Sequence, residues 1–353
     1  MTAMNKNYAI EKNMPVQFMG LNKLRGIAAI FIFLHHCRIN GYIITSFGDC
    51  FVAFFFILSG FLSTASADKR YNEKAQKFEH LVPFMMRKIQ KIYPLYLLCL
   101  ILALIVKEQH HSIKGLLLNA AMLQSWIPNP DIYFSGNSVS WFVSSLMFCY
   151  FIFIPMFRLM KLHHRAFVIL SAILYVSYIS VLQLIPDKLA TPIIYISPVM
   201  QFLAFLIGMI LWDIFMKYGS AKIQNMRIMQ KLCIIIIAAM ILLYCYVPER
   251  YSLASYWWPI WAVTIFVTAQ RDINATRYLN ETIWEKCWQI MGRISFQFYM
   301  LHTLVIAAYA RFCHYFSFES PIFLTILVTF VATLCSSLIA EMFFDAQASH
   351  QLK

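Results

Sequence analysis

The amino-acid sequence predicts an all-α polytopic membrane protein with about ten transmembrane helices. Of its 353 residues, 61% are hydrophobic and only 13% are charged, and the mean hydropathy is +0.65. A soluble domain has roughly 45–50% apolar and about 25% charged residues, so this composition excludes an ordinary soluble protein. A helix needs about 20 mainly apolar residues to cross a bilayer, and segments of this kind recur along the whole chain.

The predicted helices are separated by connections that are too short to fold alone, and no period marks an array of repeats. They occupy residues 22–40, 48–66, 92–107, 138–158, 166–185, 191–216, 231–247, 252–270, 288–311 and 320–343. Residues 1–19 are predicted to be a cytosolic segment without the apolar core of a cleaved signal peptide. Residues 20–345 then form the transmembrane domain, and residues 346–353 form a cytosolic tail.

The distribution of positive charge predicts that both termini face the cytosol. One apolar stretch, from Gly115 to Trp126, is only about 12 residues long, a length typical of a re-entrant or interfacial helix. If it does not cross, 23 Lys and Arg residues lie on the cytosolic side and 6 lie outside; if it crosses, the numbers become 14 and 15. Cytosolic loops carry an excess of Lys and Arg, so the sequence favours the first arrangement. The net charge of +13 is thereby assigned to membrane orientation and not to nucleic-acid binding.

The nine cysteines lie mostly inside apolar segments, with no C-x-x-C pair and no His–Cys spacing of a metal site. Cysteines in such surroundings behave as small apolar residues. Neither a disulfide framework nor a metal centre is expected.

The first predicted helix contains the stretch "LRGIAAIFIFLHH", from Leu24 to His36. Arg25 and His36 are eleven residues apart, which places them within roughly 20° of one helix face and about 16 Å apart along the axis, whereas His35 is rotated roughly 80° away. An ionisable group at membrane depth normally faces a cavity or a partner. An imidazole accepts a proton near neutral pH, and a guanidinium binds phosphate. From this helix alone, two interpretations stay open: the two ends of a channel for a long anionic ligand, or an interfacial arginine and a histidine that is hydrogen-bonded to a neighbouring helix.

Three further stretches match a known pattern together with this helix. They are "FFFILSGFL" (Phe54 to Leu62), "RKIQKIYPLYL" (Arg87 to Leu97) and "GRISFQFYMLH" (Gly292 to His302). In order and spacing, the four stretches resemble the membrane-bound acyltransferase 3 family. Its pattern has an Arg and a His separated by ten residues, then Phe-Phe-x-Leu-Ser-Gly-Phe, a basic pair before Ile-Tyr-Pro, and Ile-Ser-Tyr-x-Leu-Tyr-x-x-His. The resemblance extends from about Gly20 to Phe344.

The resemblance implies an integral-membrane O-acyltransferase of the bacterial inner membrane. Such an enzyme moves an acetyl or other acyl group from cytosolic acetyl-CoA to a hydroxyl of a cell-envelope polysaccharide or lipid-linked sugar, and no metal is expected. Carried over by position, His36 is the catalytic general base and Arg25 is its essential partner. Lys88 and Lys91, with the adjacent Arg87, face the CoA phosphates.

The chain departs from the family pattern at two places. The basic pair is Lys-x-x-Lys and not Arg-x-x-Arg, which keeps the charge but loses the bidentate phosphate geometry of arginine. The stretch "SWFVSSLMF" (Ser140 to Phe148) lacks the acid of the Ser-Val-Glu that many members carry. No catalytic carboxylate is therefore expected on that helix.

Other residues of these stretches have two interpretations each. His302 orients His36 or the acceptor, or it is a buried histidine whose hydrogen bonds are made within the protein and which has no catalytic role. Ser59 and Gly60 permit close helix packing, with a cofactor role as the alternative. Trp141 stacks on an acceptor sugar, or it belongs to the interfacial aromatic belt.

Two charged residues near the C-terminal motif are assigned structural roles. Glu341 is expected to be an ion-pair partner at the cytosolic surface. Arg293 lies on the opposite helix face from His302 and is expected to be a positive-inside anchor.

Two other function classes compete with acyl transfer. A multi-pass transporter of a glycan or acyl intermediate is the main alternative, although the sequence has no inverted repeat and no matching pair of broken helices. A lipid-linked-glycan polymerase or glycosyltransferase would need a large outer loop or acidic catalytic groups. The longest predicted outer loop, residues 108–137, has only two acidic residues, Glu108 and Asp131.

Overall fold

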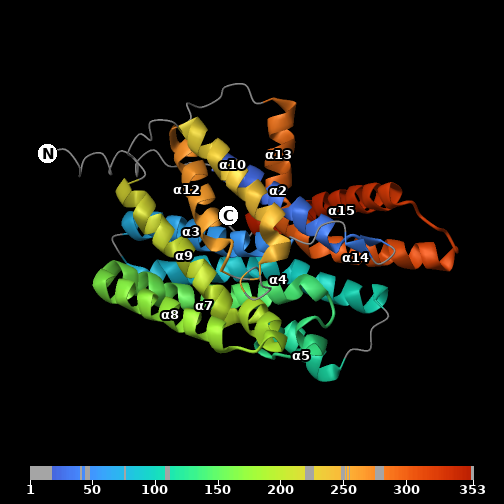
Figure 1. Cartoon of the computed structure of the whole chain (residues 1–353), viewed down its shortest axis with the longest axis horizontal. Coiled ribbons are helices and arrows are strands. Elements are labelled where there is room, and N and C mark those ends of the chain that lie inside the picture. The colour runs from blue at the N-terminus through green and yellow to red at the C-terminus, as the bar shows by residue number, and fades with distance from the viewer. Residues whose placement is uncertain are drawn as a thin grey trace.

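The computed structural model describes residues 18–350 except 40–41, 44–47, 75–76, 108–111, 219–225, 248–250, 252, 254 and 275–281. Each of the ten predicted segments contains a long helix (Figure 1). These helices are α2 (Met19–His36), α3 (Cys50–Glu73), α4 (Leu81–Val106), α7 (Trp141–Leu162), α8 (His164–Leu184), α9 (Pro198–Tyr218), α10 (Met226–Leu243), α12 (Trp258–Asn274), α14 (Ser295–Tyr315) and α15 (Ile322–His350). The all-α fold class is therefore confirmed.

Shorter elements connect the long helices. They are α5 (Ile113–Ala120), α6 (Pro130–Tyr133), α13 (Ile283–Arg293), the 3₁₀ turns η1 (Phe78–His80), η2 (Gln124–Trp126), η3 (Ser138–Ser140), η4 (Asp187–Leu189) and η6 (Tyr244–Tyr246), and the π-helical turn η5 (Thr191–Ile196). The two-residue strands β1 (Arg38–Ile39) and β2 (Tyr42–Ile43) pair antiparallel.

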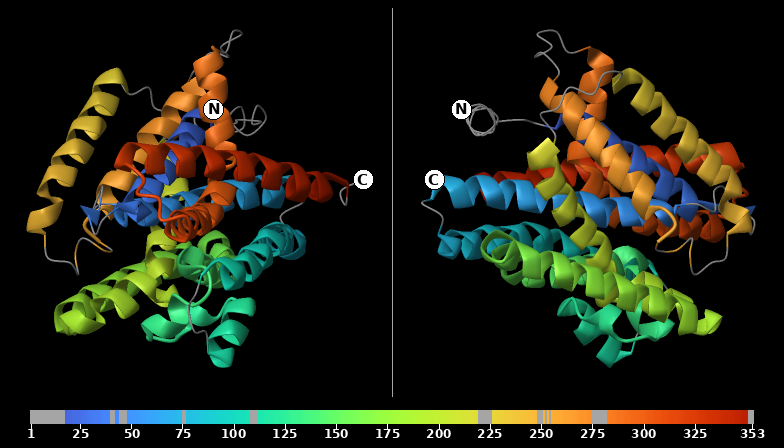
Figure 2. Two further views of the ribbon diagram at one scale, coloured as in Figure 1. Left: turned by 90° about the vertical axis from the view of Figure 1, so that its right-hand side faces the viewer. Right: turned by 60° about the vertical axis from the view of Figure 1, so that its left-hand side comes forward.

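Six of the described helical segments are long and apolar enough to cross a membrane, and the bent pair α13–α14 would make a seventh. Helices span bilayers because they satisfy every backbone hydrogen bond internally. The predicted spans α2, α10 and α12 are shorter or more polar than these, so the total of ten spans stays a prediction. Figure 2 shows α10 at the edge of the molecule, beside α12.

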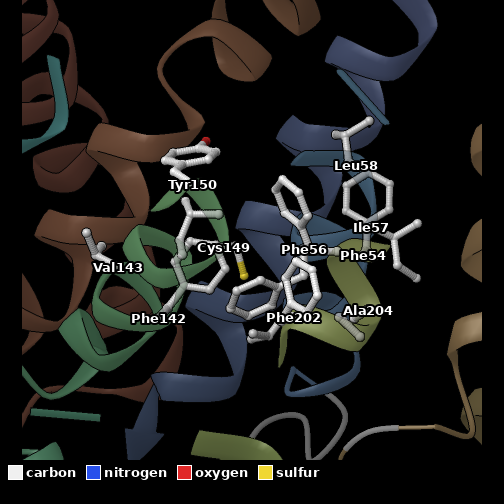
Figure 3. Close-up of a cluster of buried hydrophobic side chains, with 14 of the residues drawn as sticks. Phe54, Phe56, Ile57, Leu58, Phe142, Val143, Cys149, Tyr150, Phe202 and Ala204 are labelled. Carbon is white, nitrogen blue, oxygen red and sulfur yellow. The ribbon is translucent and has the colours of Figure 1, made fainter. Parts of the chain in front are cut away.

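The centre of the bundle is an aromatic core where α3, α7 and α9 meet. In Figure 3, Phe54 and Phe56 of α3 lie near Phe142 of α7 and Phe202 of α9. The rings of Phe56 and Phe142 have centroids 4.7 Å apart. Aromatic pairs at this spacing add to the free energy gained from apolar burial, so this core fixes the positions of α3 and α7, which line the candidate site, against α9.

Helices α3 and α9 approach closely because each carries a glycine at the crossing. A Cβ on Gly60 would lie 2.0 Å from the backbone oxygen of Phe205, and a Cβ on Gly208 would lie 2.0 Å from that of Ile57. Small residues allow such approach between membrane helices. Gly60 therefore has the packing role.

The stretch from Gly115 to Trp126 folds into α5 and η2 and not into a long helix. The eight residues of α5 rise about 12 Å, too little for a hydrocarbon core of about 30 Å. A buried polar network fixes this region on α4: Tyr96 donates to Asn119 Oδ1 at 2.6 Å, and Gln124 Nε2 donates to the Tyr96 hydroxyl at 2.9 Å. The segment is too short to cross, as expected, while the side of the membrane on which it lies stays a prediction.

The predicted segment 288–311 is wrong as one continuous helix. Helices α13 and α14 are bent by 72° at Ile294, and in Figure 1 α13 stands at a steep angle to α14. A capping box from Thr282 and Glu285 starts α13 as a separate amphipathic helix. It packs against α2 so closely that a Cβ on Gly292 would lie 2.1 Å from the backbone oxygen of Asn22.

The N-terminal end of α2 is held by α12. The carboxylate of Asp272 accepts hydrogen bonds from Gly20 N–H at 3.0 and 2.9 Å and from Leu21 N–H at 3.3 Å. These donors have no acceptor within their own helix. The contact joins residues 252 positions apart, and it sets the position of the helix that carries Arg25 and His36.

Candidate active site

Two cavities lie along α2, one lined by Arg25 and the other lined by His36, at the two ends of the predicted channel. The first, here called the Arg25 cavity, has a volume of about 580 Å³ and is lined by Arg25, Lys88 and other residues of α2, α3, α4, α7, α13, α14 and α15. The second, here called the His36 cavity, has a volume of about 770 Å³ and is lined by His36 and His35 among others. Tyr299 of α14 lines both cavities.

The Arg25 cavity is strongly positive. Four cationic side chains line it: Arg25 of α2, Lys88 and Lys91 of α4, and Arg293 of α13. No aspartate or glutamate is among the lining residues that the structure describes. Arg293 also pairs with Glu341 outside the lining, so the positive charge of the lining side chains exceeds the negative charge around them, and the electrostatics of this cavity favour an anionic ligand.

The two lysines of the basic motif reach this cavity in different ways. Lys88 is partly buried; its Nζ donates to Ser63 Oγ at 2.7 Å and lies 5.0 Å from the ring centroid of Tyr150. Lys91, three residues on, lines the same cavity from an exposed position. Arg87 is exposed and is not one of the described lining residues. Ser59 lines the cavity, whereas its neighbour Gly60 packs on α9.

The ion pair expected of Glu341 is present, with Arg293 as its partner, while its location at the cytosolic surface stays a prediction. The Arg293 guanidinium forms an ion pair with Glu341, donating from Nε to Oε1 and from Nη2 to Oε2. Arg293 is exposed and also lines the Arg25 cavity, and its role as a positive-inside anchor stays a prediction. The bend at Ile294 invalidates the helical-face argument, because Arg293 and His302 belong to different helices.

The structure brings the two motif histidines together: His36 lines the His36 cavity, whereas His302 is not among the described lining residues. His36 Nδ1 lies 2.8 Å from the backbone oxygen of Ile32 and 3.3 Å from Nε2 of His302. His302 is fully buried, and its Nδ1 lies 2.6 Å from the backbone oxygen of Tyr299. A carbonyl oxygen only accepts hydrogen bonds, so Nδ1 of each ring carries the proton. The unprotonated Nε2 of His302 then faces the Nδ1–H of His36, and Nε2 of His36 is the basic atom.

A carboxylate that sequence reasoning missed lines the same cavity as His36. Asp49, directly before α3, accepts a hydrogen bond from the Tyr195 hydroxyl at 3.0 Å and lies 3.5 Å from His35 Nε2. Trp141 is buried, and its ring centroid is 4.6 Å from that of Tyr195. All four residues line the His36 cavity. The available signal was that Asp49 is the one acidic residue between positions 22 and 66.

Lys107 brings a positive charge to the same cavity from the C-terminal end of α4. Its Nζ donates to Ser138 Oγ at 3.2 Å. Burial lowers the pKa of Lys107 from 10.5 to about 8. The His36 cavity therefore holds acids, a cation and hydroxyl groups, which suits a polar acceptor. Among the described residues, no group of three His, Cys, Asp or Glu side chains is arranged to hold a metal ion.

Tyr299 stands between the cavities and is fixed in place. Its hydroxyl donates to the backbone oxygen of Val139 at 2.9 Å, and its ring centroid is 5.2 Å from that of Phe142. It is three residues before His302 on α14. The positive cavity and the histidine pair are thus separated by one aromatic side chain and its packing partners.

Comparison with known proteins agrees with the motifs. The acyltransferase 3 family model, described as an acyltransferase domain, matches residues 19–341. A curated relative, acyltransferase MdmB of Streptomyces mycarofaciens, is 28% identical over 165 residues, which cover 41% of this chain and 41% of the relative. The chain thus matches about two fifths of that relative's length. No solved structure matches the chain.

Proposed function

Because the chain belongs to the acyltransferase 3 family of membrane-bound acyltransferases, we propose which donor and acceptor it uses. The donor is acetyl-CoA from the cytosol, and the acceptor is a hydroxyl of a cell-envelope polysaccharide or lipid-linked sugar. The protein then works in the bacterial inner membrane, with both termini in the cytosol.

The observation that carries the donor assignment is the charge of the Arg25 cavity. Arg25, Lys88 and Lys91 line it together with Arg293, which pairs with Glu341, and CoA carries several phosphate charges. Arg25 contributes the fork geometry that suits phosphate, while Lys88 and Lys91 meet it as point charges. The acyl end of the donor has to reach the histidine pair, about 16 Å farther along α2. A long, flexible donor with its charge at one end and its reactive group at the other fits this arrangement.

The acceptor hydroxyl reacts in the His36 cavity. Nε2 of His36 takes the hydroxyl proton as the oxygen attacks the thioester carbonyl carbon. The C–S bond then breaks, and the departing thiolate takes the proton from the imidazolium, so that an ester and CoA thiol leave. A positioned base of this kind raises the reaction rate by about 10²- to 10⁴-fold. His302 acts through His36: its Nε2 lies 3.3 Å from Nδ1 of His36, close enough to share the Nδ1–H that points to the Ile32 carbonyl oxygen, and this keeps Nε2 of His36 basic.

The purified protein in lipid nanodiscs tests this proposal. It should release CoA thiol from acetyl-CoA only when a glycan acceptor is present, and the His36→Ala variant should not. Mass spectrometry of surface glycan should show an acetyl ester in cells with the protein and none in cells without it. Acceptor-independent thiol release, or an unchanged glycan together with transport of the intact acceptor, would contradict acyl transfer.

A further inference from the structure

The wall of the Arg25 cavity includes the first turn of α14. Ser295, Phe296 and Gln297 all line the cavity, directly after the 72° bend. The first N–H groups of a helix have no acceptor within that helix, and Ile294 at the N-cap provides no side-chain cap. Backbone donors of α14 are therefore available at this wall.

Two side chains of this turn are buried without a partner. Ser295 is 1% exposed and Gln297 is 4% exposed, and neither Ser295 Oγ nor Gln297 Oε1 has a hydrogen-bond partner in the described part of the chain. The other amide side chains of the cavity differ. Asn22 Nδ2 donates to Gln289 Oε1 at 3.3 Å, and Gln289 Nε2 donates to the backbone oxygen of Met19 at 3.0 Å. Since buried polar groups are normally paired, the first turn of α14 stands out as a site for a polar ligand.

The chemistry of the two side chains selects the ligand. The Gln297 carboxamide carries both a donor and an acceptor, so a ligand group that also carries both can satisfy it. A phosphate oxygen pairs with the donor alone and leaves the amide oxygen unpaired, and the cations of the cavity already provide for the phosphates. A secondary amide suits it, because such a group donates through N–H and accepts through C=O. The backbone N–H groups and the Ser295 hydroxyl can serve that C=O.

The position of the turn agrees with this choice. Ser295 and Tyr299 are four residues apart on α14, so they share a helix face that leads from the positive cavity to the His36 cavity. A donor with phosphates on the cations and its acyl group beyond Tyr299 has to pass this wall. The part of acetyl-CoA between those ends is the pantetheine arm, which contains two secondary amides.

We propose that Ser295, Gln297 and the first N–H groups of α14 bind an amide of the pantetheine arm, so that the enzyme recognises pantetheine thioesters as a class. This inference rests on the proposed function, in which the Arg25 cavity takes the donor. It predicts that the nucleotide part contributes affinity but that the amide decides which thioesters are used.

The test compares donors within each protein variant. The donors are acetyl-CoA, S-acetylpantetheine, and two S-acetylpantetheine analogues in which one amide N–H or the other is replaced by an ester oxygen. For the unmodified protein, one of the two replacements should raise KM by about tenfold, the order expected when a buried acceptor loses its donor. In the Gln297→Leu variant, KM for the amide donors should rise, and the difference in KM between amide and ester donors should shrink. The Ser295→Ala variant should show the same changes more weakly. Each ratio of two KM values is measured on one sample, so a smaller amount of folded protein in a variant does not change the ratio.

Two controls separate the outcomes. Gln183→Leu removes a glutamine that donates to the Tyr251 hydroxyl outside the cavity, and it should leave all KM values unchanged. Lys88→Met should raise KM for acetyl-CoA and not for S-acetylpantetheine, which has no phosphate. If the unmodified protein uses amide and ester donors equally well, or if Gln297→Leu keeps the full difference, the inference is wrong although acyl transfer stands. No transfer from any of the donors would refute the proposed function and this inference together.

Discussion

The two lysines of the basic motif should have unequal effects on donor binding, because the structure places them in different surroundings. Lys88 is partly buried between Phe84 and Tyr150, with Nζ 5.1 and 5.0 Å from the two ring centroids. Lys91 is exposed at the same cavity. We expect Lys88→Met to raise KM for acetyl-CoA far more than Lys91→Met does, with little change in KM for the acceptor.

The size of the difference follows from burial. A hydrogen bond to a charged group contributes about 1.5–3 kcal/mol where solvent is excluded, which corresponds to a rise in KM of about 10- to 150-fold. An exposed ion pair contributes about 1 kcal/mol or less, which corresponds to about fivefold at most. Salt screens exposed charges within about 8–10 Å at moderate ionic strength and within about 3 Å at 1 M. The effect of Lys91→Met should therefore disappear at high salt, while most of the effect of Lys88→Met should persist.

The assay is CoA thiol release at saturating acceptor, with acetyl-CoA varied at low and high salt and rates normalised to the amount of folded protein in the membrane. Lys69→Met is the matched control, because Lys69 is exposed, pairs with Glu73 at 3.8 Å and lines neither cavity. Equal rises in KM for the Lys88 and Lys91 variants would refute the burial argument. An unchanged KM in Lys88→Met would remove the basic motif from the donor site.

Four further results are expected. His36→Ala should lower the transfer rate by at least about 100-fold in a folded, inserted protein, whereas His35→Ala should retain substantial activity; equal losses would contradict the assignment of the base. Reporters fused after Lys107 and after Trp126 should map to the same, outer side of the membrane, and opposite sides would show that the short segment crosses. Asp272→Ala should lower the free energy of unfolding by about 1 kcal/mol, because the first N–H groups of α2 lose their acceptor, and an unchanged midpoint of thermal unfolding would argue against that anchor. Burial lowers the pKa of Lys107 to about 8, so between pH 8 and 10.5 the unfolded chain still holds a proton that the folded protein has lost. The free energy of unfolding, measured relative to Lys107→Met, should therefore rise with pH across that window. Parallel curves of stability against pH for the two proteins would count against the shift.

Several features of the site depended on contacts that the sequence does not display. The bend at Ile294 brings Arg293 into the Arg25 cavity and leaves Ser295 and Gln297 at its wall, whereas hydropathy predicted one unbroken span. The pairing of Asp49 with His35 and Tyr195 joins α2, the start of α3 and η5. Such contacts depend on how separate helices cross, and that is set by close packing between residues far apart in the chain.

By itself, the sequence determined the local properties of the chain. The helical class and the positions of the long helices, apart from the bent pair α13–α14, follow from apolar length. The placement of Arg25 and His36 on one face of α2, about 16 Å apart along its axis, follows from the helical repeat. The tertiary structure alone decided which groups meet near Arg25 and near His36: the four cations of three helices around one cavity, the contact of His36 with His302, and Tyr299 between the two cavities. A repeat within one helix is encoded by neighbouring residues, whereas a cavity between helices exists only where their packed surfaces leave space.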